Sequence, residues 1–210
     1  MNKILQKLSS IHKIYEILAS LQRENIRLKL ENERLTKLSL LDPLTGIANR
    51  RYLERNLQQE YKNSLRHSHN LGLLMIDLDR FKLYNDHFGH QAGDQLLIEI
   101  TLTFEEVLRR PKDMLFRYGG EELICLLPNT SVEGVTQVGQ KLLTTARKCG
   151  VTVSIGAICA NASKLESPQQ LLEIADQAMY QAKNQGRDRL IFRQVTNNVY
   201  EVNAEICISN

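Results

Sequence analysis

The chain has 210 residues, of which 42% are apolar and 24% charged, with 11 glycines and 4 prolines. This length suits one domain with an appendage, and the composition excludes a disordered, collagen-like or membrane-embedded chain. The net charge is +3, but residues 1–41 hold eight Lys and Arg against four Asp and Glu. The remainder is therefore close to neutral, and we expect no nucleic-acid-binding face and no nucleic-acid partner.

Membrane and redox signals are also weak in the sequence. No apolar run is long enough to span a bilayer, and the N-terminal residues lack the apolar core and cleavage site of a signal peptide. We therefore expect a cytoplasmic protein with no membrane partner. The cysteines are far apart and form no CxxC pair, so we expect buried or incidental thiols rather than a zinc site or a disulfide framework: Cys125, Cys149, Cys159 and Cys207.

Residues 1–41 predict a helical stalk. The segment has no Gly or Pro, and its heptad seam has Ile4, Ile11, Leu18, Asn25 and Asn32 at a and Ile14, Leu21, Leu28 and Leu35 at d. Asparagine is tolerable in such a seam when it pairs with its mate on a parallel helix. The pattern therefore predicts a parallel coiled coil and a homodimer. The alternative is a single amphipathic helix folded back on its own domain.

A domain of alternating helices and strands is predicted over residues 42–193. Asp42-Pro43 ends the stalk, because the residue before proline avoids the α region. In chain order the expected elements are a helix at 50–66, a strand Leu71–Asp77, a helix at 91–109, strands Met114–Tyr118 and Glu121–Leu127, a helix at 132–148, a strand Val151–Ala157, a helix at 168–184 and a strand Leu190–Arg193.

These elements predict an α/β fold with a mixed central sheet and flanking helices, preceded by the long N-terminal helix. Gly119-Gly120, between two apolar runs, predicts a tight hairpin. Residues 194–210 form a C-terminal tail with no clear period and no predicted role.

Four carboxylates follow apolar strands: Asp77, Asp79, Glu121 and Glu122. If the hairpin packs beside the first strand, they converge on one edge and repel one another unless a cation lies among them. Oxygen ligands favour a hard divalent ion such as magnesium, which also binds substrate phosphates. The alternative for each carboxylate alone is a solvated strand end.

The sequence also contains cations and polar groups that could bind a nucleotide. Lys82 follows the first acidic pair, and Lys183 and Arg187 have the i, i+4 spacing that places two cations on one helical face to grip a polyphosphate. Their alternative role is a solvated helix end. Asn85, His90 and Asp94 could read a purine edge, since an aspartate can accept from N1–H and the exocyclic amine of guanine; His90 alone could equally be structural.

Over about residues 40–193 the sequence resembles the GGDEF family of bacterial diguanylate cyclases. The matching motifs are DPLTGIANRR at 42–51, DLDRFKLYND at 77–86, GHQAGD at 89–94, RYGGEEL at 117–123, VSIG at 153–156, and Ala175-Asp176 followed by Tyr180, Lys183, Gly186 and Arg187. The resemblance implies a palm-like sheet related to nucleotide cyclases, GTP as substrate and cyclic di-GMP as product. Leu123 stands where the family has phenylalanine, and we expect this difference to change the turnover rate rather than to abolish activity.

The resemblance also implies roles for individual residues. It assigns Mg²⁺ or Mn²⁺, two ions per active site, to Asp77, the Leu78 carbonyl, Glu121 and Glu122, and Glu121 is the candidate to assist deprotonation of the attacking hydroxyl. It assigns guanine recognition to Asn85 and Asp94, a further substrate contact to His90 and phosphate binding to Lys183 and Arg187. From their residue types we add Lys82, whose charge suits phosphate, and Gly119 and Gly120, where a β-carbon would obstruct its approach. Arg110-Pro111-Lys112-Asp113 matches the family's RxxD product-inhibition site, and its alternative is a turn broken by Pro111.

Two other function classes agree less well with the sequence. One is a GGDEF domain that has lost turnover and binds GTP or cyclic di-GMP, which the intact Glu121 and Glu122 disfavour. The other is a zipper-type nucleic-acid binder, which would need a dense basic block before the stalk.

Overall fold

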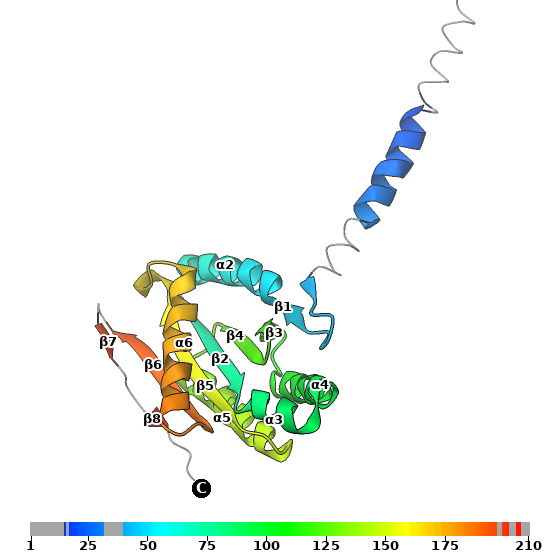
Figure 1. The fold of residues 1–210 in the computed structure, drawn as a ribbon. Coiled ribbons are helices and arrows are strands. Elements are labelled where there is room, and N and C mark those ends of the chain that lie inside the picture. Colours follow the sequence, from blue (N-terminus) through cyan, green and yellow to red (C-terminus); the bar gives the residue numbers. More distant parts are fainter. Residues whose placement is uncertain (1–14, 16, 32–39, 197–198, 202–204, 207–210) are drawn as a thin grey trace, which may run out of the picture. The chain divides into compact units, whose positions relative to one another are not determined.

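The computed structural model describes residues 15, 17–31, 40–196, 199–201 and 205–206, and the chain divides into two units, Met1–Leu40 and Leu41–Asn210. In the first unit, residues 17–31 form a helix (Figure 1). The long N-terminal helix is not confirmed beyond this stretch. Five of the predicted seam positions lie outside the described residues: Ile4, Ile11, Ile14, Asn32 and Leu35.

The second unit contains a mixed sheet with strand order β1-β3-β4-β2-β5-β6-β7, and β8 also pairs with β6. The strands are β1 (Ala48–Asn49), β2 (Asn70–Leu78), β3 (Met114–Gly119), β4 (Glu122–Pro128), β5 (Val153–Asn161), β6 (Arg189–Thr196), β7 (Val199–Glu201) and β8 (Glu205–Ile206). The central strand β2 runs antiparallel to both neighbours, β4 and β5, whereas β5 and β6 are parallel. The predicted mixed α/β sheet is confirmed.

Helices cover both faces of this sheet (Figure 1). They are α2 (Arg50–His67), α3 (Phe81–Phe88), α4 (His90–Val107), α5 (Val132–Lys148) and α6 (Pro168–Asn184). Two buried cores follow from the alternation of side chains along the strands. In β2, Leu74 and Ile76 join the core beneath α4 and α5, while Leu73 and Met75 join the core beneath α2 and α6.

The helix ends have local causes. Asn49 caps α2 by accepting from the Tyr52 amide, and Ser131 caps α5 by accepting from the Gly134 amide. Pro168 stands in the first turn of α6, where its missing N–H costs nothing. None of the helices in the described ranges is long and apolar enough to cross a membrane.

Three features were not predicted from the sequence. Helix α3 follows Arg80, whose φ is 58°; it has only 8 residues, none of them buried, so it is too short for a clear apolar stripe. The short strand β1 has only two residues. Two strands, β7 and β8, arise within the C-terminal tail and pair with β6.

Candidate active site

Strands β2 and β4 bring the predicted carboxylates to one edge of the sheet. Asp77, in the central strand, stands directly opposite Glu122 of β4 and Ser154 of β5. Glu121 precedes Glu122 in the β3–β4 turn, and Asp79 follows the end of β2. We call Asp77, Asp79, Glu121 and Glu122 the acidic edge. Glu121 lies in the turn and not in the strand predicted to begin there, because the connection between β3 and β4 takes two residues.

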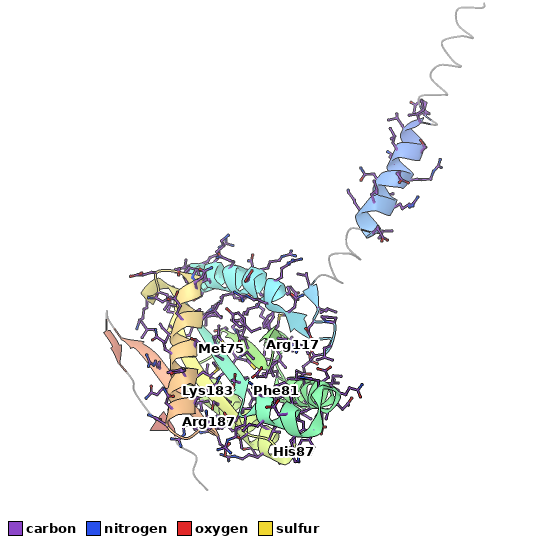
Figure 2. The ribbon with its side chains drawn as sticks, viewed as in Figure 1. Met75, Phe81, His87, Arg117, Lys183 and Arg187 are labelled. Atoms are coloured by element: carbon purple, nitrogen blue, oxygen red, sulfur yellow. The ribbon has the colours of Figure 1, made fainter. Side chains whose placement is uncertain are left out.

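Lys183 binds Asp77 across this edge. Asp77 is 7% exposed, and Nζ of Lys183, in the last turn of α6, lies 2.7 Å from its Oδ2 (Figure 2). The approach of α6 depends on Gly156 in β5, where an added Cβ would lie 2.0 Å from the Ala175 carbonyl oxygen and 2.3 Å from the Met179 amide nitrogen. The α6 backbone therefore lies directly on β5, and this places Lys183 over Asp77.

The acidic edge carries excess negative charge. Burial raises the pKa of Asp77, Lys183 lowers it, and Glu121 and Asp79 raise it further. Burial also raises the pKa of Glu122; Asp77 adds to this rise, Lys183 opposes it, and Asp176 and Glu121 add to it. The carboxylates therefore repel one another, and Lys183 offsets only part of this repulsion.

The donor set of this edge fits a hard divalent cation. Its donors are all oxygens, and their mutual repulsion is relieved by a bound cation. Across the described ranges, however, no three His, Cys, Asp or Glu side chains are grouped as ligands of one ion. Asp77, Glu121 and Glu122 thus do not form a complete ligand group in this conformation. Oxygens from the backbone and substrate would have to complete the set, as is usual for magnesium.

The predicted nucleotide-binding residues on the β3–β4 hairpin, α3 and α4 are mostly exposed. Gly119, the last residue of β3, and Gly120, the first residue of the β3–β4 turn, are exposed, and Gly120 has a φ of 54°, which favours glycine. Lys82 lies exposed in the first turn of α3. His90 is the first residue of α4 and is exposed, as is Asp94 one turn further along. Asn85 is half-buried on α3.

Arg187 does not share a helical face with Lys183, so that prediction is wrong. Helix α6 ends at Asn184, and Gly186, Arg187 and Asp188 have φ values of 119°, 64° and 49°. These left-handed residues form a loop that the i, i+4 spacing ignores. The Arg187 amide donates to the Ala182 carbonyl at 3.0 Å, which keeps the exposed arginine beside the last turn of α6 (Figure 2).

Asp79 has a role that the sequence did not reveal. Its carboxylate accepts from the Thr152 hydroxyl at 2.8 Å, the Ser154 hydroxyl at 2.6 Å and the Asp188 amide at 3.0 Å. The residue therefore ties the end of β2 to β5 and to the loop that carries Arg187. Its partners are 73 to 109 residues away along the chain, so no local signal could have identified them.

Arg117 is a second residue that sequence reasoning left without a role. Its Nη1 lies 2.9 Å from Oδ1 of Asp42, and its Nε donates to the Gly120 carbonyl at 2.9 Å. Burial opposes ionisation of Asp42, but hydrogen bonds from Thr45 and Arg117 hold its pKa below the ordinary value. Arg117 thus joins the first residues of the domain to the turn that carries Glu121.

The predicted product-inhibition residues lie between α4 and β3. Arg110 and Asp113 form an ion pair at 3.6 Å, and their side chains are 46% and 3% exposed. The Arg110 guanidinium also donates to the Thr130 hydroxyl and to the Pro128 and Asn129 carbonyls. Burial raises the pKa of Asp113, and Arg110 lowers it. In this conformation the guanidinium of the partly exposed Arg110 is held by these contacts, and the Asp113 side chain faces the protein.

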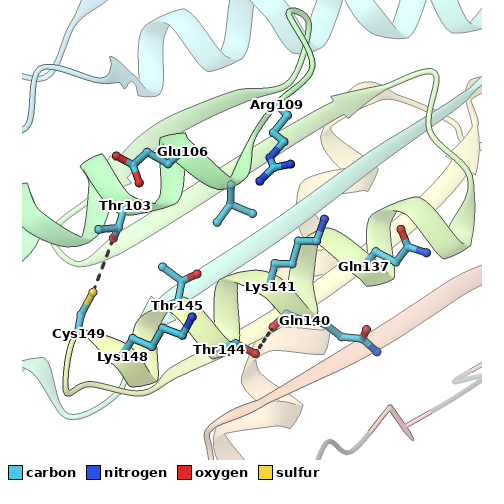
Figure 3. Close-up of a pocket in the computed structure, with 11 residues that line it drawn as sticks. Thr103, Glu106, Arg109, Gln137, Gln140, Lys141, Thr144, Thr145, Lys148 and Cys149 are labelled. Atoms are coloured by element: carbon cyan, nitrogen blue, oxygen red, sulfur yellow. Dashed lines mark hydrogen bonds between the residues drawn. The ribbon is translucent and has the colours of Figure 1, made fainter.

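A cavity of about 700 Å³ lies between α4 and α5 (Figure 3). Its lining includes Arg109, Lys141 and Lys148, but none of the residues predicted to bind metal, substrate or product. The size of this cavity alone does not make it a candidate active site, because no reactive side chains converge in it. The acidic edge is therefore the candidate active site.

Comparison with known proteins agrees with this geometry. Residues 39–189 match the family model described as the diguanylate cyclase GGDEF domain. Diguanylate cyclase DgcP of Pseudomonas aeruginosa is 39% identical over 170 residues, which cover 77% of this chain and 25% of DgcP. The chain thus spans about a quarter of that relative's length.

Two solved structures extend the comparison. Diguanylate cyclase SiaD of P. aeruginosa, in complex with its activator SiaC, is 34% identical with a TM-score of 0.71, covering 91% of this chain and 74% of that one. The coiled coil and GGDEF domain of DgcB from Caulobacter crescentus, in complex with c-di-GMP, is 26% identical with a TM-score of 0.77. The match covers 85% of this chain and 98% of the DgcB chain. With a family model matched over most of its length, the chain belongs to the GGDEF-domain family of diguanylate cyclases.

Proposed function

We propose that the protein is a diguanylate cyclase that condenses two GTP molecules into cyclic di-GMP and releases two pyrophosphates. The observation that carries this proposal is the acidic edge, where Lys183 lies 2.7 Å from Asp77 among mutually repelling carboxylates. An excess of carboxylate oxygen beside a lysine suits a metal-bound triphosphate.

The residues of the edge divide the work of binding and proton transfer. Asp77, the Leu78 carbonyl, Glu121 and Glu122 would hold two Mg²⁺ or Mn²⁺ ions, which lower the pKa of the attacking hydroxyl and neutralise the leaving pyrophosphate. Glu121 accepts the proton of the 3′-hydroxyl. An added Cβ at Gly119 or Gly120 meets no other atom within 4 Å, so the turn leaves open space for phosphate oxygens.

Cations and polar side chains then place the nucleotide. Lys82, Lys183 and Arg187 bind the triphosphate, and Lys183 shares or releases its contact with Asp77 when it does so. Asp94 accepts from N1–H and the 2-amino group of guanine, and Asn85 and His90 add further contacts to the base.

The decisive experiment is incubation of the purified chain with GTP and Mg²⁺, with the products identified by mass spectrometry. We expect cyclic di-GMP and pyrophosphate. Binding of GTP or cyclic di-GMP by calorimetry without any product would instead support the alternative, a catalytically weak GGDEF domain that acts as a binding module. Leu123, where the family has phenylalanine, is fully buried opposite Ile76, so the hairpin core stays apolar despite the smaller side chain.

The reaction also requires a second domain. Each domain binds one GTP, so two must face each other, and a parallel dimer of the stalk would supply the second at high effective concentration. In the helix at 17–31 the seam residues Leu18, Leu21 and Leu28 are 49%, 60% and 59% exposed, so they are accessible to a second helix. The DgcB chain of similar structure also contains a coiled coil.

Charging the seam tests this dimer. Replacing Leu21 and Leu28 with lysine should produce monomers by sedimentation and make activity per molecule fall steeply on dilution. The matched control replaces Ile26 and Leu30 with lysine. These residues are 60% and 61% exposed but lie outside the seam, so the control should behave as wild type. A seam variant that is fully active as a dilute monomer would contradict the proposal.

Product inhibition at Arg110 and Asp113 belongs to the same proposal. The exposed part of the Arg110 guanidinium could pair with a phosphate of cyclic di-GMP. Asp113 could contact a guanine only after its side chain leaves its buried position, so we expect inhibitor binding to rearrange this corner.

A further inference from the structure

Gly93 lies where α4 passes closest to the side chain of Asn85. An added Cβ at this buried glycine would lie 1.8 Å from Oδ1 and 2.9 Å from Cγ of Asn85, and 3.2 Å from Cζ of Phe81. Real Cβ atoms essentially never come within 3.0 Å of such neighbours. Only glycine therefore leaves room for the Asn85 carboxamide against α4, beside which α3 lies in Figures 1 and 2.

The Asn85 side chain is held in this place without an internal hydrogen bond. Its Oδ1 is buried and has no hydrogen-bond partner among the described residues. The α3 backbone around it is fixed, since the Asn85 carbonyl accepts from the Gly89 amide at 2.8 Å. A buried acceptor without a partner is costly, so this orientation of the carboxamide calls for an explanation. With Oδ1 turned against Gly93, the amide Nδ2 remains as the donor for a ligand.

We propose that Gly93 is a positioning residue for guanine recognition, because the missing Cβ seats the Asn85 carboxamide with its amide group available to the base. Asp94, the next residue of α4, would accept from N1–H and the 2-amino group, and Asn85 would donate to O6. This pair complements guanine, while the 6-amino group of adenine would meet the Asn85 donor. The inference rests on the proposed GTP-binding function and explains its base selectivity.

A double-mutant cycle tests the inference in the full chain. The variants Gly93→Ala, Asn85→Ala and their combination are titrated with α,β-methylene GTP and Mg²⁺ by calorimetry, which needs no turnover. Gly93→Ala should weaken binding about 3- to 10-fold, the range of one lost hydrogen bond. The double variant should bind no more weakly than Asn85→Ala, because the added Cβ then has no carboxamide to displace.

Further readouts separate positioning from a general loss of structure. Gly93→Ala should raise the KM for GTP and lower the preference for GTP over ATP, yet leave kcat at saturating GTP unchanged. The control Gln95→Ala, at an exposed position of the same helix, should match wild type. If Gly93→Ala fails to fold, the double variant should fold, since the obstructing carboxamide is gone.

Three results would overturn the inference: wild-type affinity in Gly93→Ala, effects of the two substitutions that multiply in the double variant, or a double variant that also fails to fold. The wild-type titration separates this failure from that of the proposed function. If wild-type protein does not bind the GTP analogue, the proposed function itself is wrong and the inference is lost with it.

Discussion

The acidic edge and the Arg110–Asp113 corner each join a buried aspartate to a cation, but they differ in what surrounds the pair. Lys183 lies 2.7 Å from Asp77, whose pKa is raised by burial and by two further carboxylates. Arg110 lies 3.6 Å from Asp113, whose pKa is raised by burial with no contribution from another acid. Both regions contain a buried aspartate, so burial does not distinguish them. The acidic edge differs from the corner by its excess negative charge, which a bound cation would neutralise.

Neutralising the edge should produce the largest effect. Asp77→Asn and Glu121→Gln should each slow cyclic di-GMP formation about 100- to 10,000-fold, since a metal ligand or proton acceptor is lost. The initial rate with saturating GTP and Mg²⁺ measures this. Glu99→Gln, an exposed carboxylate on α4, is the matched control and should retain the wild-type rate. Wild-type rates in either edge variant would remove the edge from the mechanism.

Asp79 offers a test of structure beside the same edge. Asp79→Ala removes three hydrogen bonds and leaves the fully buried Ser154 hydroxyl without its acceptor. The free energy of unfolding should fall by about 3 kcal/mol, as measured by urea denaturation. The KM for GTP should rise, because the Arg187 loop loses its anchor. Asp86→Ala, at an exposed position, is the control, and equal stability of the two variants would contradict this role.

The corner should affect regulation and not turnover. Arg110→Ala should leave the initial rate intact and raise the inhibition constant for added cyclic di-GMP about tenfold or more, the worth of one charge-assisted contact. The neighbouring Arg109→Ala provides a charge-matched control and should remain inhibited. If Arg110→Ala is inhibited as strongly as wild type, the corner does not bind the product.

The smallest effect concerns pH. Because the pKa of Asp113 is raised in the folded protein, the contribution of Asp113 to stability should fall as pH increases from 3.8 towards the raised value. Asp113→Asn should therefore gain stability relative to wild type across this window. The pKa of Asp42 is lowered, so its ionisation stabilises the fold above pH 3.8 and this contribution is lost at lower pH. Asp42→Asn should show the opposite trend. Denaturant unfolding at pH 3 to 7 measures both variants, and trends of the same sign would contradict this prediction.

Much of the scaffold was predictable because its signals are local. Helices 132–148 and 168–184 have the bounds predicted for them, since Ser131 and Pro168 mark their starts and apolar periodicity their lengths. The apolar run in β2 and the Gly119-Gly120 turn predicted the central strand and the hairpin. The motifs and their order also identified the family, because each motif is a run of residues close together in the sequence and can be recognised without the fold.

The sequence by itself thus determined the element types, the carboxylates and glycines of the candidate site and the family. Only the tertiary structure decided which of these groups meet. Asp79 anchors the Arg187 loop, Lys183 reaches Asp77, and Gly93 faces Asn85 because strand register and helix packing bring distant segments together. Arg187 left the predicted helical face because the backbone turned left-handed after Asn184. Periodicity and capping act over a few residues, whereas these contacts depend on how whole elements are stacked.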